Sequence, residues 1–273
     1  MSRRLHSGET RLLMIEPLAR LGYASKSVVY AIVGVLAILT ALNRGGRVTD
    51  TSGALRVVMT QPFGKILLGL LAVGLCGYAI WRVLDSFLDP DRDGTTAGGL
   101  VTRIGNGVRG CIYGALGFEA FRLLRGLGGS NGNEARLYTA RILDWPLGQV
   151  LLGIIGVIVA VYGASQLLDS IRGKRDAKLD MTCFSSEWRH PLENISRFGV
   201  GVRGGLIATL GFFLVRAAWT HDPSEAVGQR ESMLQLGGLV EGRWFLAILA
   251  AGVLAYAVDQ AVHAWCRRIR PVV

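Results

Sequence analysis

Arg20-Leu21-Gly22-Tyr23-Ala24-Ser25-Lys26 is the first of three copies of one short pattern. The pattern begins again at Arg103-Ile104-Gly105 and at Arg197-Phe198-Gly199, 83 and 94 residues further along. In each copy a second cation follows six residues after the leading arginine, at Lys26, Arg109 and Arg203. A pattern that recurs at a nearly fixed interval across a chain indicates an internal repeat, so it decides the architecture before any single segment does.

The chain is too apolar for an ordinary soluble domain. Of its 273 residues, 51% are hydrophobic and 18% are charged, and its mean hydropathy is +0.38. A helix that crosses the hydrocarbon core of a bilayer needs about 20 apolar residues, and terminal arginines and lysines lengthen a shorter run by reaching the headgroups. The apolar runs predict six membrane-spanning helices, at about residues 21–42, 62–84, 102–124, 146–171, 198–219 and 243–266.

We therefore expect an all-α integral membrane protein made of three parallel helical-hairpin repeats, with pseudo-three-fold symmetry about the membrane normal. Its expected parts are an N-terminal tail (1–16), repeat 1 (17–90), repeat 2 (100–172), a polar linker (173–194) and repeat 3 (195–268). The basic flank of the first span is typical of a secretory signal peptide. Because the span belongs to the repeat, we interpret it as a retained helix.

The net charge of +10 indicates topology rather than a nucleic-acid surface. In the six-span arrangement, 19 of the 30 lysines and arginines fall on the membrane side that holds the N-terminus. The positive-inside rule places that side in the cytoplasm, so we expect both termini, the tail and the linker there. The same surplus predicts affinity for membrane lipids, anionic lipids among them, and no nucleic-acid partner.

Small residues stand at matched places in the first helix of each repeat. Counted from the leading arginine they occupy offsets 4, 7, 11 and 14, which places them on one helix face. The three stripes are Ala24, Ser27, Ala31 and Gly34; Gly107, Gly110, Gly114 and Gly117; and Gly201, Gly204, Ala208 and Gly211. Such faces let helices approach closely in lipid, so we interpret them as packing seams.

A glycine also recurs where each second helix is expected to begin, at Gly64, Gly148 and Gly242. The loops before these glycines contain similar short segments, at residues 53–59, 134–137 and 225–227. Each segment is either a short amphipathic helix at the outer interface or a plain loop, and the helix is the favoured interpretation.

Motifs for ligands and catalysis are weak in this chain. Gly105–Gly110 and Gly199–Gly204 match the dinucleotide pattern GxGxxG, but no strand precedes them and the packing seam accounts for the glycines. Asp89–Gly94 matches half of a calcium loop, but Leu100 stands where a bidentate glutamate is required, so we interpret it as a polar turn.

The four histidines and four cysteines show no metal-ligand spacing. Cys183 and Cys266 fall on the expected cytoplasmic side, which is reducing, so no disulfide framework is expected. No serine or cysteine lies in a recognisable nucleophile motif. We therefore expect no enzyme, no catalytic residue, no metal and no cofactor.

Ionisable residues in or near the membrane are the default functional candidates. They form one set in the first helices and another near the cytoplasmic ends of the second helices, with a tyrosine seven residues before each member of the second set. The residues are Lys26, Arg109 and Arg203; Asp85, Asp169 and His263; and Tyr78, Tyr162 and Tyr256. Both charged sets lie near one leaflet, so we expect cation–carboxylate pairs between helices. These pairs either lock the helices in register, which is favoured, or form a gate across a central pathway.

Glu119 has no counterpart, since Leu36 and Phe213 occupy the same column of the other repeats. Arg122 follows it at i+3, so a local ion pair near the outer interface is the favoured interpretation. The alternative is a carboxylate that binds a ligand or handles protons.

The triple cassette, each copy opening a two-helix unit that ends in tyrosine and aspartate, resembles the bacterial membrane proteins of the family Domain of Unknown Function 1206. The likeness covers about residues 17–268. It implies a six-helix protein of the bacterial plasma membrane built from three repeats, and it supplies no activity and no functional residues. His263 departs from the pattern, because the other repeats have an acid there.

Two functions remain open from the sequence. The favoured one is a non-enzymatic structural, accessory or partner-binding component of the membrane, with lipids and other membrane proteins as partners. The alternative is a transporter or channel for a small solute or ion, with a pathway along the pseudo-three-fold axis.

Overall fold

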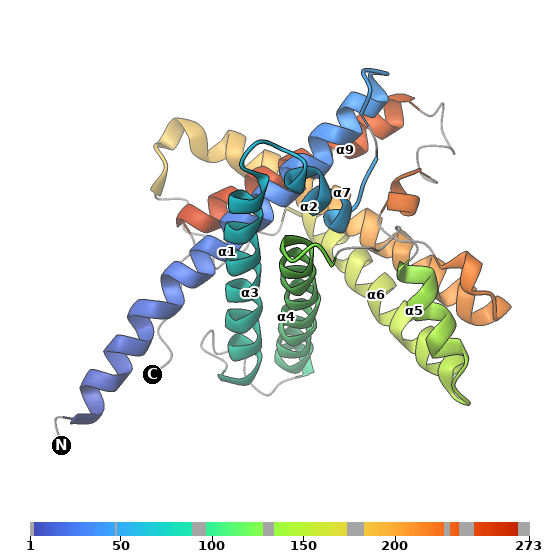
Figure 1. Cartoon of the computed structure of the whole chain (residues 1–273), viewed down its shortest axis with the longest axis horizontal. Coiled ribbons are helices and arrows are strands. Elements are labelled where there is room, and N and C mark those ends of the chain that lie inside the picture. The colour runs from blue at the N-terminus through green and yellow to red at the C-terminus, as the bar shows by residue number, and fades with distance from the viewer. Residues whose placement is uncertain are drawn as a thin grey trace.

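The computed structural model describes residues 3–46, 48–88, 97–127, 134–173, 183–226, 230–234 and 243–266. Within these ranges all regular structure is helical (Figure 1). The helices are α1 (Arg3–Ala41), α2 (Thr51–Met59), α3 (Gly64–Leu88), α4 (Ala97–Leu124), α5 (Glu134–Leu143), α6 (Gly148–Ile171), α7 (Ser186–Thr220), the 3-10 turn η2 (Pro223–Glu225) and α9 (Arg243–Cys266), with a further helical turn at residues 230–234.

Five of the described helices are long and apolar enough to cross a membrane. The candidate spans are Ala19–Ala41, Gly64–Phe87, Gly148–Ile171, Ser186–Thr220 and Trp244–Cys266. The remaining expected span, at about residues 102–124, falls in α4. This helix has 28 residues but carries several charged side chains. The described chain is therefore membrane-like by length and composition in five places, and α4 is the long helix in which no single stretch is apolar enough.

The second helices begin where the recurring glycines predict. α3 begins at Gly64 and α6 at Gly148, whereas Gly242 lies outside the described residues. At both starts the chain turns tightly away from the end of the preceding short helix. A Cβ at Gly64 would lie 2.2 Å from the carbonyl oxygen of Val58, and one at Gly148 would strike that of Ile142. Only glycine fits such a close approach.

The short segments in the loops are helical where the structure describes them. Residues 53–59 form most of α2, whose N-terminus is capped by the Asp50 carboxylate, and residues 134–137 begin α5. In the third repeat only Pro223–Glu225 form a 3-10 turn, and Val227 lies outside the described residues. The preference for helices over plain loops is thus confirmed for the first two repeats.

The most extensive helix contacts join different repeats. α3 packs on α4, α6 packs on α7, and α9 packs on α1. In each pair the second helix of one repeat meets the first helix of the next, and α9 returns the cycle to α1. Glycines make these approaches close: a Cβ at Gly110 would lie 2.7 Å from Val83 Cγ2, and one at Gly204 would lie 2.8 Å from the Leu167 nitrogen.

The leading arginine of each cassette binds the carboxyl end of its partner helix in these pairs. Arg20 donates to the carbonyl of Ala264 at 3.0 Å and also to Trp265. Arg103 donates to Ser86 and Phe87 at 2.9 and 3.0 Å. Arg197 donates from two nitrogens to Ser170 at 3.3 and 3.1 Å. The last carbonyls of a helix lack internal partners and carry partial negative charge, so each arginine closes one junction between repeats.

Packing within repeats is less regular. α1 packs on α3 and α7 packs on α9, but in the described residues α4 and α6 do not pack along their length. Figure 1 shows α6 inclined away from α4, while α3 and α4 lie side by side. Correspondingly, a Cβ added at Gly105 of α4 would meet nothing within 4 Å.

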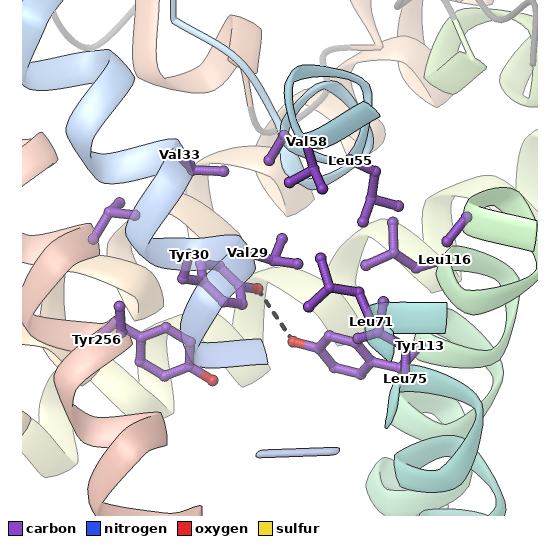
Figure 2. Packing of buried hydrophobic residues seen from close by; sticks show 14 of the residues in the cluster. Val29, Tyr30, Val33, Leu55, Val58, Leu71, Leu75, Tyr113, Leu116 and Tyr256 are labelled. Atoms are coloured by element: carbon purple, nitrogen blue, oxygen red, sulfur yellow. Dashed lines mark hydrogen bonds between the residues drawn. The ribbon is translucent and has the colours of Figure 1, made fainter. Parts of the chain in front are cut away.

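A hydrophobic core lies among α1, α2, α3, α4 and α9. Leu55 and Val58 project from α2 into this core, and Leu55 is fully buried. Figure 2 shows them facing Leu71 and Leu116, with Tyr30 and Tyr113 joined below by a 3.2 Å hydrogen bond between their hydroxyls. The short helix α2 therefore covers one end of this helix group, and the buried charged residues lie toward the other end.

Candidate functional site

Lys26 lies at the centre of a cage of tyrosines. Its ammonium is 4.5 Å from the ring centroid of Tyr78, 4.6 Å from that of Tyr113, and 5.5 and 5.9 Å from those of Tyr23 and Tyr256. It also donates to the Tyr78 hydroxyl at 3.3 Å. Only 3% of the residue is exposed. Aromatic faces stabilise a cation that has lost its water, so the four rings replace part of its hydration.

Arg82 of α3 is the most highly connected side chain of the site. It donates to the Tyr78 hydroxyl at 2.9 Å and to the Tyr23 hydroxyl at 3.0 Å. One terminal nitrogen reaches both Asp85 and Asn106 at 3.0 Å. Asn106 in turn donates to Asp85 at 2.9 Å. This buried ion pair joins α1, α3 and α4, and its extra hydrogen bonds offset the cost of taking two charges out of water.

The network continues through neutral side chains to the other two repeats. Arg109 donates to Asn106 at 3.4 Å and, across to α6, to the Tyr162 hydroxyl. Gln166 also donates to Tyr162, and it accepts a hydrogen bond from Arg203 at 3.1 Å. The Arg203 guanidinium lies 4.8 Å from the ring centroid of Tyr256 on α9. Side chains from all six long helices thus meet in one polar layer.

The end of α9 contributes a further polar group to this layer. Gln260 donates to the Asp259 carboxylate at 2.8 Å, and His263 Nδ1 lies 2.9 Å from the Asp259 carbonyl and 3.5 Å from its carboxylate. The His263 ring stacks on Tyr23 with centroids 5.4 Å apart. His263 therefore faces the same tyrosine that accepts a hydrogen bond from Arg82.

The expected pairing of the recurrent cations with the recurrent acids is wrong in the described residues. Lys26 faces tyrosines, Arg109 bonds to Asn106 and Tyr162, and Arg203 bonds to Gln166. Asp85 pairs instead with Arg82, three residues earlier on its own helix. Asp169 is half-buried near the end of α6. The prediction is wrong because tyrosine and amide side chains contact the recurrent cations, while Arg82 pairs with Asp85.

The expected ion pair between Glu119 and Arg122 is also wrong. Glu119 accepts a 2.6 Å hydrogen bond from Ser52 and lies 3.6 Å from Arg56, both on α2. Arg122 donates to the carbonyl of Leu127 instead. Because α2 packs on α4, its polar side chains reach Glu119 from a separate helix, which the spacing along α4 alone does not predict.

One column of the repeat carries polar residues that the sequence analysis did not use. Four residues after each tyrosine stand Arg82, Gln166 and Gln260. All three lie in the polar layer, as do Tyr23 and Asn106 from the columns of the first helices. Their common column next to the tyrosines was a signal that could have identified them.

Cys183 and Cys266 form a disulfide with a Cα–Cα distance of 6.0 Å. The expectation that these cysteines stay unpaired is therefore wrong for this structure. It rested on their expected place on the reducing side and on their lack of a short motif, but the pair is separated by 83 residues and is brought together only by the fold. The bond ties the segment before α7 to the last residue of α9. The suggested cation turn at Asp89–Gly94 lies outside the described residues.

Comparison with known proteins identifies the repeats. The model of the family Domain of Unknown Function (DUF1206) matches three times, at residues 21–89, 104–173 and 198–267. The uncharacterized protein YxxB of Bacillus subtilis (strain 168) is 32% identical over 244 residues, which cover 89% of this chain and 88% of that protein. No solved structure matches the chain.

Proposed function

We propose that this chain, which belongs to the family Domain of Unknown Function 1206, is a non-enzymatic, multi-pass protein of the bacterial plasma membrane with a structural, accessory or partner-binding role. The proposal includes six spans in three repeats, arranged with pseudo-three-fold symmetry. Its support is the set of three equivalent junctions, in which an arginine of one repeat binds the helix end of the repeat before it.

The proposed sixth span is α4. At 1.5 Å per residue its 28 residues extend about 42 Å, more than the hydrocarbon core requires. Its polar residues do not argue against a span, because Asn106 and Arg109 face the polar layer and Glu119 faces α2. Charged residues inside membrane proteins are normally placed in this way, toward protein rather than lipid.

Two features bear on orientation, and they point in opposite directions. The bias of lysine and arginine favours cytoplasmic termini, whereas the Cys183–Cys266 disulfide favours an oxidising compartment. The bias draws on segments along the whole chain, so we place both termini in the cytoplasm. An impermeant maleimide applied to intact cells should label Gly45→Cys and not Arg172→Cys in a cysteine-free variant. Labelling of Arg172→Cys alone would reverse the orientation.

One observation carries the structural role: the polar side chains at the centre bind one another across helices. Lys26 is enclosed by tyrosine rings, and the Arg82–Asp85 pair is completed by Asn106 and Tyr23. This arrangement holds helices in register rather than presenting a reactive group. Purification from native membranes in mild detergent tests the accessory role. We expect reproducible membrane-protein partners; a partner-free monomer in every mild detergent would contradict it.

A second candidate, transport of a small solute or ion, is favoured by a different observation. Besides His263, the described polar layer holds four basic side chains, Lys26, Arg82, Arg109 and Arg203, and the two carboxylates Asp85 and Asp259. An excess of cations in a membrane interior suits the passage of an anion. Tracer flux of chloride and phosphate into proteoliposomes is the test, with protein-free liposomes as the control.

A further inference from the structure

The contact between the two helices of repeat 2 differs from its counterparts in the other repeats. In repeat 1, Gly74 lets α3 approach α1, since a Cβ there would lie 3.0 Å from the Leu21 carbonyl. In repeat 3, Gly252 does the same for α9 and α7, since its Cβ would lie 2.4 Å from Val202 Cγ2. The matching residue of repeat 2 is Ile158, which is 62% exposed. The glycine that lets the helices of repeats 1 and 3 approach each other is therefore missing from repeat 2.

The glycines on the first helices, which face this contact from the other side, show the same difference between repeats. A Cβ at Gly22 would lie 2.4 Å from Tyr78 Cβ, and one at Gly199 would lie 2.2 Å from the Tyr256 nitrogen. The matching Gly105 of α4 has nothing within 4 Å. The hydrogen bond from Arg109 to Tyr162 joins α4 to α6. Gly105 lies one helical turn before Arg109, and Ile158 lies one turn before Tyr162. Both positions therefore lie on the helix faces that this bond joins.

Apolar side chains border this separation. Ile104, Val108 and Ile112 recur every four residues along α4 and are each more than half exposed. Their counterparts in repeat 1 include Leu21 and Ser25, which meet α3 at Gly74. In repeat 2 the same stripe is left without a helix against it in the described residues. We call the space bordered by this stripe and Ile158 the α4–α6 seam.

The cations behind the seam are bound only to neutral groups. Within the described residues Arg109 donates to Asn106 and Tyr162, and Arg203 donates to Gln166. A guanidinium has five N–H donors, and carboxylate or phosphate oxygens are its strongest acceptors. Both residues are part-buried, whereas only 3% of Lys26 and 6% of Arg82 are exposed. Two guanidiniums without an acid between them match a ligand that carries an oxyanion.

We propose that the α4–α6 seam binds one anionic phospholipid, with its phosphate held by Arg109 and Arg203 and an acyl chain along Ile104, Val108 and Ile112. This inference rests on the membrane placement in the proposed function. The apolar border of the seam selects a lipid over free phosphate, because an ion in water gains nothing from exposed isoleucine and valine. Arg109 lies six residues, or about 9 Å of helix, beyond Arg103, so the headgroup sits below the helix ends.

Native mass spectrometry of the full chain in mild detergent with added phosphatidylglycerol tests the site. We expect one tightly retained lipid, with binding at least about tenfold weaker in the double variant Arg109→Gln, Arg203→Gln. Arg172→Gln, which changes an exposed arginine at the end of α6, is the matched control and should bind as the wild type does. Unchanged retention in the double variant would overturn the proposal.

Ile158→Gly provides an independent test that removes no cation. It restores the residue type of repeats 1 and 3, so α6 should close on α4 and the lipid should be lost while the arginines stay. This variant also decides the case if the double variant fails to fold, as judged by helicity and thermal unfolding. Retention of the lipid by a folded Ile158→Gly variant would contradict the seam as its binding place.

Two further outcomes would overturn the assignment of the ligand. Displacement of phosphatidylglycerol by millimolar inorganic phosphate would indicate a free oxyanion, and a dimer that forms as lipid is removed would indicate a second copy of the chain. Alkaline carbonate extraction separates this inference from the proposed function. A chain extracted by carbonate fails both, whereas a membrane-retained chain that binds no phosphatidylglycerol fails the lipid site alone.

Discussion

The two halves of the polar layer are built from matching columns of the repeat, yet they differ in closure. Around Lys26 and Arg82 the helices touch, four tyrosine rings cover the ammonium, and Asp85 balances one charge. Around Arg109 and Arg203 the partners are neutral, the side chains are part-buried and Gly105 faces open space. The same repeat has therefore produced one closed half and one less closed half, and the proposed lipid would bind in the second. Ile158 in place of glycine is the residue that separates them.

The largest expected effect is on the closed half. Arg82→Met breaks hydrogen bonds to four partners and removes the guanidinium that lies 3.0 Å from the buried Asp85 carboxylate. The loss of one member of a buried ion pair costs about 3–5 kcal/mol, so the free energy of unfolding in detergent should fall by that amount. Chemical denaturation followed by circular dichroism measures it, with Arg172→Met as the control. A loss below about 1 kcal/mol would show that the pair is not structural.

Gly74→Ile should separate α3 from α1, as α6 is separated from α4 in repeat 2. The added side chain meets Ser25 and the Leu21 carbonyl, and this overpacking costs about 3 kcal/mol. Fluorescence-detected thermal unfolding should show a lower midpoint than that of Gly205→Ile, which makes the same change in α7 where an added Cβ meets nothing within 4 Å. A midpoint equal to the control would mean that α1 and α3 do not need the glycine.

Arg109→Met should cost less than Arg82→Met, about 1–2 kcal/mol, because its loss strands no carboxylate in the described network. Denaturation of the two variants side by side compares the halves directly. Equal losses would contradict the distinction between a structural cation and a ligand-facing one.

The smallest effect is expected at the cover formed by α2. Glu119→Gln weakens the contacts to Ser52 and Arg56 and should destabilise α2 locally by about 1 kcal/mol. Hydrogen exchange of the α2 amides should become faster while exchange in α6 stays unchanged. Uniformly faster exchange in both helices would instead place Glu119 in the global core.

The repeat made the architecture readable, but it did not reveal which helices are neighbours. Gly64 and Gly148 begin helices as expected, since a tight turn between helices leaves a local mark in the sequence. The partner of a helix leaves no such mark. The repeat shows that Asp85 and Asp169 occupy equivalent positions, but it does not show that Asp85 pairs with Arg82. The Cys183–Cys266 bond and the contact of Glu119 with α2 depend on tertiary proximity in the same way.

The difference between the closed contacts and the α4–α6 seam is tested most directly by cross-linking matched positions. In a cysteine-free background, Ser25→Cys with Gly74→Cys places two thiols in the contact of α1 with α3. A Cβ at Gly74 would lie 3.0 Å from Ser25 Cβ, within about 0.5 Å of the separation that a disulfide needs. Val108→Cys with Ile158→Cys is the equivalent pair in repeat 2. A disulfide requires Cβ atoms about 3.5–4.5 Å apart. Mild oxidation in membranes should join the repeat 1 pair rapidly and the repeat 2 pair at least about tenfold more slowly. Equal rates for the two pairs would contradict the open seam.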